Sequence, residues 1–485
     1  MPNSNIFLEG NYAPIREEHS LSLNQDLELK GKIPKDLVGS LYRNGPNPQF
    51  DPGKKYHWFF GDGMVHHFRF NKGNVSYQNR YVQTPTYVRE KKAARSLFSI
   101  PNNNFISNLR LLSGNFGTLL AGILKNKNAD VYTKLIAKSN TALCRHHDKL
   151  YALVESSPPV KINPATLESE GFEDFQTDFL SPFTAHPKLD PVSGYLYGIG
   201  YRISGKPALE FYVITPTGKM VSRTAIDIPY RAMVHDFVIT NEYAIIGVFP
   251  AIASLRNIQN GSLAAWSDTE KAYLYVIPKS GESHGIFHLE IEPGYIYHFV
   301  NAYQNQDEII IDGFRSDKVP LMGTDEDHRA ILEKNLDPNR LHRYLIDLKN
   351  QTLRETAFSE ITGEFPVIDP RLVGTKHTHF YCATTTRPNA EGSFNAQRAV
   401  DLRRDKPSTT LCEFPRGHFG GEPILVPTGK IGQTKGYLLN IIYDSTTDRS
   451  YLGIWDAAHI DKKTICEIWL PHRIPYGFHG LWVGG

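Results

Sequence analysis

Short apolar segments closed by turn-forming residues follow one another along most of this chain. The segments are rich in Tyr, Ile and Val and are bounded by Gly, Pro, Asn or Asp, which is typical of β-strands joined by turns. Examples are residues 150–156, 195–202, 242–249, 308–315, 379–386 and 436–444. Because helical patterns do not alternate with these segments, the sequence predicts an all-β barrel, sandwich or propeller.

A repeated unit favours the propeller among these three. Three stretches carry a histidine near their start, continue through a turn and end in an apolar strand; they are residues 184–202, 233–250 and 297–315. A propeller needs such repetition, because each blade buries its face against the next. The histidines of the three units, His186, His235 and His298, are predicted to begin inner strands and to point toward the propeller axis.

Three histidines that converge on an axis would form a transition-metal site. Neutral imidazole suits iron, copper, zinc and nickel, so the type of ligand leaves the metal open. A single strand histidine is more simply interpreted as an ordinary core or surface residue. Recurrence of the histidine at one place in three units makes the metal site an equal alternative.

Composition and the absence of common motifs argue against several classes of function. The formal net charge is only +2, which argues against a nucleic-acid binder. Aromatic residues make up 12% of the chain, which agrees with a large apolar interior or tunnel, although strands alone also explain it. The sequence carries no phosphate-binding loop, no HExxH zinc motif and no GxSxG nucleophile motif.

The cysteines and the N-terminal pattern indicate a reduced compartment. Four scattered cysteines form neither a disulfide framework nor a CxxC pair; they are Cys144, Cys382, Cys412 and Cys466. The first residues lack a signal-peptide pattern, and no apolar run is long enough to span a bilayer. We therefore expect a cytoplasmic protein.

Ordered motifs along nearly the whole chain resemble the carotenoid cleavage oxygenases, a family that includes carotenoid dioxygenases, lignostilbene dioxygenases and the retinal pigment epithelium isomerase. The matching motifs are FLEGNYAPIREE, GSLYRNGPNPQF, YHWFFGDGMVHHFRF, SNTALCRHHDKLYALVESSPP, FTAHPKLDP, MVHDFVIT, YHFVNAY, GEFPVIDPR, GEPILVP and PYGFHGLWV. The opening and the long apolar insertion are most similar to the plant-type enzymes that cleave carotenoids near the 9,10 double bond.

The resemblance implies one domain over residues 1–485, a seven-bladed β-propeller with a helical and loop cap over an iron-containing face. By motif, one Fe(II) would be held by His186, His235, His298 and His479. The repeated unit does not select His479, because PYGFHGLWV lies too near the C-terminus to show a turn and strand behind it.

The resemblance also implies supporting residues. Glu155, Glu364 and Glu422 match family carboxylates that accept the outer N–H of the histidine rings. Without the resemblance, each would be an ordinary turn residue. Thr141 matches a family threonine near an open coordination position, where it would restrict access; a strand hydroxyl bonded to backbone is the alternative.

The implied reaction is oxidative cleavage of a conjugated C=C bond by O2 into two carbonyl fragments, with no organic cofactor. The lignostilbene branch uses a lysine before the first glutamate and an upstream tyrosine to bind a phenol. Val154 replaces that lysine here, whereas Tyr87 matches the tyrosine. We expect a hydrophobic polyene, either a carotenoid or an apocarotenoid; stilbene or phenylpropene cleavage is the alternative, and isomerohydrolase activity is weaker still.

Residues ~92–138 interrupt the β pattern with apolar residues and flanking lysines. Leu112, Phe116, Leu119, Leu120 and Ile123 have helical spacing, although nearby glycines weaken it. Residues 105–124 are expected either to dock on a membrane surface, giving a peripheral membrane contact, or to pack on the propeller face. A second short helix is predicted over 324–336, with acidic residues that cap its start.

Two interpretations from other classes remain. A catalytically silent propeller would bind a hydrophobic ligand or a partner, but the retained histidines and glutamates argue against it. A propeller hydrolase with calcium would need oxygen ligands instead of imidazoles.

Overall fold

A computed structural model describes residues 5–23, 25–53, 56–97, 137–203, 205–254, 264–319, 339–387 and 394–485 of the chain. Most of the insertion, including the helix expected around 112–123, lies outside these residues. The short helix predicted over 324–336 also lies outside them.

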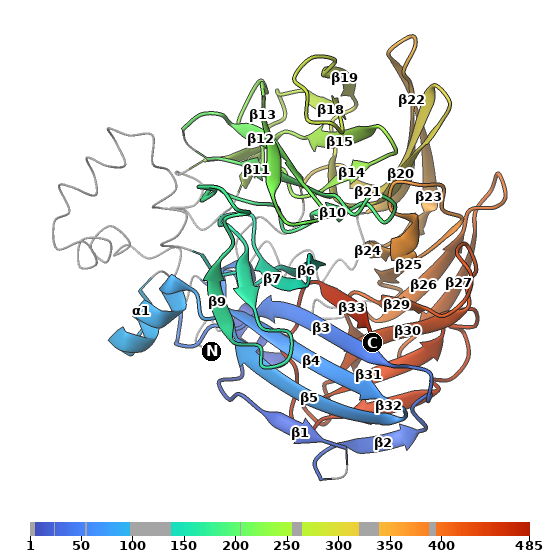
Figure 1. The fold of residues 1–485 in the computed structure, drawn as a ribbon. Coiled ribbons are helices and arrows are strands. Elements are labelled where there is room, and N and C mark those ends of the chain that lie inside the picture. Colours follow the sequence, from blue (N-terminus) through green and yellow to red (C-terminus); the bar gives the residue numbers. More distant parts are fainter. Residues whose placement is uncertain are drawn as a thin grey trace.

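Seven antiparallel sheets stand around a common axis in the described part of the chain (Figure 1), which confirms the seven-bladed propeller. Blade 1 contains β1 (Ser20–Ser22), β3 (Gly39–Pro46), β4 (Gly63–Asn71), β5 (Asn74–Tyr81) and β33 (Gly480–Gly484). Blade 2 contains β6 (Ala142–His146), β7 (Lys149–Leu153), β8 (Val160–Ile162) and β9 (Ser169–Phe172). Blade 3 contains β10 (Lys188–Leu189), β11 (Leu196–Tyr201), β12 (Leu209–Ile214) and β13 (Met220–Ile226).

The remaining blades follow in chain order. Blade 4 contains β14 (Phe237–Ile239), β15 (Tyr243–Val248), β18 (Ala272–Pro278) and β19 (Phe287–Ile291), with a separate ribbon of β16 (Ala251–Ala253) and β17 (Ala264–Trp266). Blade 5 contains β20 (Tyr295–Asn305), β21 (Glu308–Ser316), β22 (Arg340–Asp347) and β23 (Thr352–Thr362). Blade 6 contains β24 (Glu364–Val367), β25 (His379–Thr384), β26 (Ala396–Asp401) and β27 (Ser408–Glu413). Blade 7 contains β28 (His418–Gly420), β29 (Ile424–Pro427), β30 (Gly436–Asp444), β31 (Arg449–Asp456), β32 (Cys466–Trp469) and β2 (Glu28–Gly31).

Both ends of the chain close the ring. The C-terminal β33 pairs with the N-terminal β3 at the inner edge of blade 1, where Leu41 faces Trp482. The N-terminal β2 pairs with β32 at the outer edge of blade 7, where Leu29 faces Ile468. Two blades are therefore each assembled from segments that lie at opposite ends of the sequence.

The burial of each strand follows its place in its blade. The central strand β12 is buried along its whole length, because neighbouring blades cover both of its faces. The outer strand β13 alternates between buried and exposed positions, because one face meets solvent. The apolar clusters therefore lie between the blades and hold them in a ring around the axis.

Short helical elements lie at the edge of the ring. Of the described residues, one segment forms an α-helix, α1 (Pro85–Ala93), whose N-cap Thr84 accepts a hydrogen bond from the Tyr87 N–H at 3.1 Å. The 3₁₀ turns are η1 (Ile6–Leu8), η2 (Gly10–Tyr12), η3 (Trp58–Phe60) and η4 (Pro370–Leu372). Aromatic residues of η1–η3 form a cluster with Tyr476 and Phe478. This part of the expected cap therefore contacts Phe478, the residue directly before His479. No helix in the described ranges is long and apolar enough to cross a bilayer.

Buried ion pairs fix the points where the insertion joins the propeller. Lys138 Nζ lies 2.7 Å from Asp62 Oδ1 and 3.1 Å from Glu90 Oε2. The other oxygen of Glu90 accepts the Leu97 N–H at 2.8 Å. The residues on either side of the insertion therefore meet at one carboxylate on α1.

Candidate metal centre

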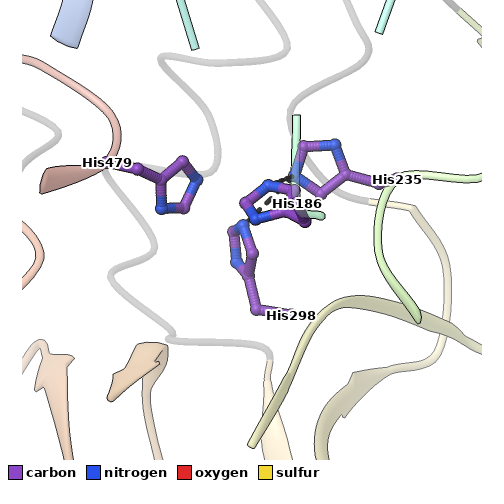
Figure 2. A group of neighbouring side chains, drawn as sticks. All are labelled: His186, His235, His298 and His479. Carbon is purple, nitrogen blue, oxygen red and sulfur yellow. Dashed lines mark hydrogen bonds between the residues drawn. The ribbon is translucent and has the colours of Figure 1, made fainter. Parts of the chain in front are cut away.

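Four histidines from four blades meet on the axis. His186 and His235 each stand two residues before an innermost strand, β10 and β14, whereas His298 lies near the start of β20 and His479 directly precedes β33. One potential ligand atom from each ring lies within 4.8 Å of the other three. Figure 2 shows the four rings turned toward one another. The repeated unit thus places its three histidines together, and the ring closure adds His479.

Three of the rings are held from behind by the predicted glutamates. His298 Nδ1 lies 2.5 Å from Glu364 Oε2, and His479 Nδ1 lies 2.8 Å from Glu422 Oε1. His235 Nδ1 likewise contacts Glu155 Oε1. A carboxylate acceptor fixes the proton on Nδ1, so the Nε2 lone pair of each ring points at the axis.

This donor set fits a cation. His235 Nε2 lies 3.0 Å from His186 Nε2 and 3.1 Å from His298 Nε2. Lone pairs that face one another at this distance repel, unless a positive ion lies between them. Adjacent ligands on a metal with M–N bonds of ~2.1 Å lie ~3 Å apart, in agreement with these separations. The three carboxylates supply the negative charge that four neutral imidazoles lack.

Burial keeps the rings in the form that binds metal. Burial and the neighbouring rings hold the pKa of His186, His298 and His479 well below the usual histidine value, so these imidazoles are neutral. Burial also opposes protonation of His235, but the Glu155 carboxylate outweighs it and raises the pKa of His235. Without a cation on the rings, burial raises the pKa of Glu364 to about 8 and that of Glu422 to about 7. A divalent ion held by the histidines would favour the charged form of both carboxylates.

Asp236, which the sequence analysis did not select, ties three of the histidine segments together. Its Oδ1 lies 2.6 Å from the Nζ of Lys188 and accepts the Phe237 N–H at 2.8 Å. Its Oδ2 accepts the Phe299 N–H at 3.0 Å. Lys188 follows His186 by two residues and Phe299 follows His298 by one, so a single carboxylate sets the spacing of three strand starts. Its position directly after His235 is the one feature of the sequence that could have indicated this role.

The fourth ligand candidate is fixed by its backbone. The His479 N–H donates to the Thr141 carbonyl at 3.2 Å, and the His479 carbonyl accepts the Asn44 N–H at 3.0 Å. Thr141 is buried beside this segment, and its hydroxyl donates to the side chain of Asn140 at 3.0 Å. The structure thus places Thr141 next to His479, and its role in access to the metal stays a prediction.

Aromatic rings surround the histidines. Phe365 packs against His298 and His479, with ring centroids 5.2 Å and 5.1 Å away. Tyr297 packs edge-on against His235 at 5.4 Å. Such rings offer apolar contact surface beside the histidines and suit an apolar substrate.

Two positions bear on the binding of a phenol, Val154 and Tyr87. Val154 is buried directly before Glu155. Tyr87 lies on α1 in a separate small cluster with Met64 and Tyr81, its ring 5.1 Å from that of Tyr81. The match of Tyr87 to a phenol-binding residue stays a prediction.

The fold and site define a seven-bladed β-propeller with an axial four-histidine metal centre. Residues 12–484 match the family model described as retinal pigment epithelial membrane protein. The chain is 31% identical to the apocarotenoid-15,15'-oxygenase of Synechocystis, covering 94% of this chain and 92% of that protein. It is 30% identical to the carotenoid 9,10(9',10')-cleavage dioxygenase 1 of Arabidopsis thaliana, covering 98% and 89% of the two chains. The crystal structure of Pseudomonas brassicacearum lignostilbene dioxygenase superimposes with a TM-score of 0.84 at 26% identity, over 100% of both chains.

The chain therefore belongs to the retinal pigment epithelial membrane protein family, that is, to the carotenoid cleavage oxygenases. The family resemblance drawn from its motifs is confirmed.

Proposed function

We propose that this protein is a non-haem iron(II) dioxygenase that cleaves a C=C bond of a carotenoid or apocarotenoid. The observation that carries the proposal is the convergence of four histidines, three of them backed by carboxylates, of which Glu364 and Glu422 are buried and Glu155 is partly buried. Imidazole ligands suit iron, and the three carboxylates balance a divalent charge. The four candidate ligands are imidazole nitrogens, whereas calcium prefers oxygen ligands.

Iron(II) in this site would supply dioxygen activation, so that one O2 and one C=C bond give two carbonyl groups. The protein's own residues would orient the ligand rings and shield the metal. Glu155, Glu364 and Glu422 hold the rings in the tautomer that binds metal. Phe365 and Tyr297 provide apolar walls beside the metal. Thr141, close to His479, would limit which molecules reach an open position.

The preference for a polyene depends on Val154. A buried, uncharged side chain before Glu155 offers no ammonium group to a phenolate. The surrounding aromatic rings instead suit an extended hydrocarbon chain, because their uncharged faces can contact such a chain along its length. Several relatives carry names of enzymes that act on carotenoids or apocarotenoids, whereas others, at 28% and 29% identity, are named isoeugenol monooxygenase and resveratrol cleavage oxygenase 1.

The test is product mass analysis with iron-loaded protein. An apocarotenal and a hydroxystilbene are incubated separately, in air and without O2, and metal content is measured on the same sample. We expect one iron per chain and O2-dependent aldehydes from the apocarotenal, with His186→Ala as an inactive control. Cleavage of the stilbene alone would contradict the substrate assignment. Full iron loading without product from either compound would favour a silent, ligand-binding propeller.

A further inference from the structure

A buried tyrosine beside the metal centre has a hydroxyl that no described residue satisfies. Tyr295, at the start of β20, is 1% exposed, and its hydroxyl has no hydrogen-bond partner in the described part of the chain. Buried tyrosine hydroxyls usually have a hydrogen-bond partner, because a buried hydroxyl without one costs about 1–3 kcal/mol. A group of this kind, close to a binding site, indicates a partner that arrives from outside the protein.

Ring contacts connect Tyr295 to the metal centre. Its ring packs edge-on against Tyr297 with centroids 4.8 Å apart, and Tyr297 packs edge-on against His235 at 5.4 Å. Residues 295 and 297 lie two apart on one strand, so their side chains share a face. Tyr295 therefore lies two ring contacts from a predicted ligand.

This side of the site is also the one that solvent reaches. His186 and His235 are partly exposed, whereas His298 and His479 are buried. Tyr201 of β11 packs against the cluster that contains Tyr295 and is itself only partly buried. Tyr201, Tyr295 and Tyr297 thus form an aromatic group beside His235, with an unsatisfied hydroxyl at Tyr295.

We propose that the Tyr295 hydroxyl binds an oxygen atom on the end group of the substrate, either a hydroxyl or a carbonyl. This inference rests on the proposed function and adds a specificity-determining residue to it. Burial holds the pKa of Tyr295 well above its usual value, so the phenol stays protonated and can donate to such an oxygen. A polyene with an oxygen-bearing end would be placed lengthwise by this bond, and its hydrocarbon counterpart would not.

The test separates binding from turnover. Iron-loaded protein is kept without O2, and dissociation constants are measured for an apocarotenal and for the hydrocarbon of the same chain length that lacks the oxygen. We expect wild type to prefer the oxygenated compound by roughly 2- to 10-fold, the weight of one neutral hydrogen bond. Tyr295→Phe should abolish this preference without changing hydrocarbon binding or iron content.

Tyr344→Phe is the matched control. Tyr344 belongs to the same apolar cluster and is equally buried, but its hydroxyl interacts with Glu355 and it lies on β22, away from the axis. The Tyr344→Phe variant should keep the preference for the oxygenated compound over the hydrocarbon. An unchanged preference in Tyr295→Phe, or an equal loss in Tyr344→Phe, would overturn the inference. Failure of the proposed function would instead show as absence of product when O2 is admitted, with the binding comparison intact.

Discussion

Replacing Glu422 by Gln should weaken iron binding more than replacing Glu364 by Gln, although the two substitutions are chemically identical. Both carboxylates are 8% exposed, and each accepts the Nδ1–H of one histidine. Loss of the negative charge is therefore common to both variants. Changes of residues that orient metal ligands cost 10- to 100-fold in metal affinity, and we expect roughly that loss from Glu364→Gln.

The difference arises from the second oxygen of each carboxylate. Glu422 Oε2 accepts the Gly480 N–H at 2.6 Å and lies 3.7 Å from the buried guanidinium of Arg43. An amide NH₂ at this place would face another donor and leave Arg43 without its counter-charge. Glu364 Oε2 accepts the His298 Nδ1–H and the Phe365 N–H, whereas among the described residues its Oε1 accepts from the side-chain amide of Asn339 alone, at 3.4 Å. That amide can turn its oxygen toward an NH₂ group.

A buried donor left unpaired costs about 1–3 kcal/mol. In the metal-free protein His479 can move its proton to Nε2 and accept the Gln NH₂ at Nδ1, whereas a bound ion requires the Nε2 lone pair and restores the clash. Iron affinity in Glu422→Gln should therefore fall a further 5- to 150-fold or so below that in Glu364→Gln. The assay is iron content at equilibrium with chelators of graded strength, with near-UV circular dichroism to confirm that both variants are folded. Equal affinities, or a weaker effect at Glu422, would refute this account of the two oxygens.

Three further predictions follow from the same geometry. Deleting residues 476–485 removes His479 and β33 together, so iron content by mass spectrometry and turnover should both be lost; retention of either would exclude His479 from the site. Asp236→Asn places an NH₂ group against Lys188 or a backbone N–H, and we expect roughly tenfold or greater loss of iron affinity in the chelator assay, against no change if Asp236 is a bystander. Burial lowers the pKa of His66 to about 3, so below pH ~6.5 the unfolded chain takes up a proton that the native protein does not. The free energy of unfolding in urea should then fall by about 2 kcal/mol between pH 6.5 and 5, and His66→Gln should remove this part of the loss; parallel pH curves would contradict it.

The repeated unit predicted a propeller and three of the four axial histidines, because three blades carry one pattern, whereas the number of seven blades was implied by the family resemblance. His186, His235 and His298 belong to blades made from consecutive strands, so each histidine precedes its own turn and strand. His479 belongs to blade 1, in which β33 is followed in space by β3, from the other end of the chain. The repeat is interrupted there by topology, and only the family resemblance selected this residue.

The residues that support the ligands could not be predicted from local patterns. Glu155, Glu364 and Glu422 lie 80, 66 and 57 residues from the histidines that they contact. Asp236 acts through the Lys188 ammonium group and the Phe299 N–H of neighbouring blades, and no composition or period marks such a role. Unsatisfied hydroxyls such as that of Tyr295 become visible only when all neighbours are known.

The ring closure gives the folding reaction a defined last step. Residues 39–43 pair with residues 480–484, so this contact closes a loop of nearly the whole chain, and contacts of such sequence separation form late. His479 directly precedes that final strand. The four-histidine centre is therefore incomplete in every partly closed ring, and uptake of a metal ion becomes a kinetic reporter that the last strand has docked.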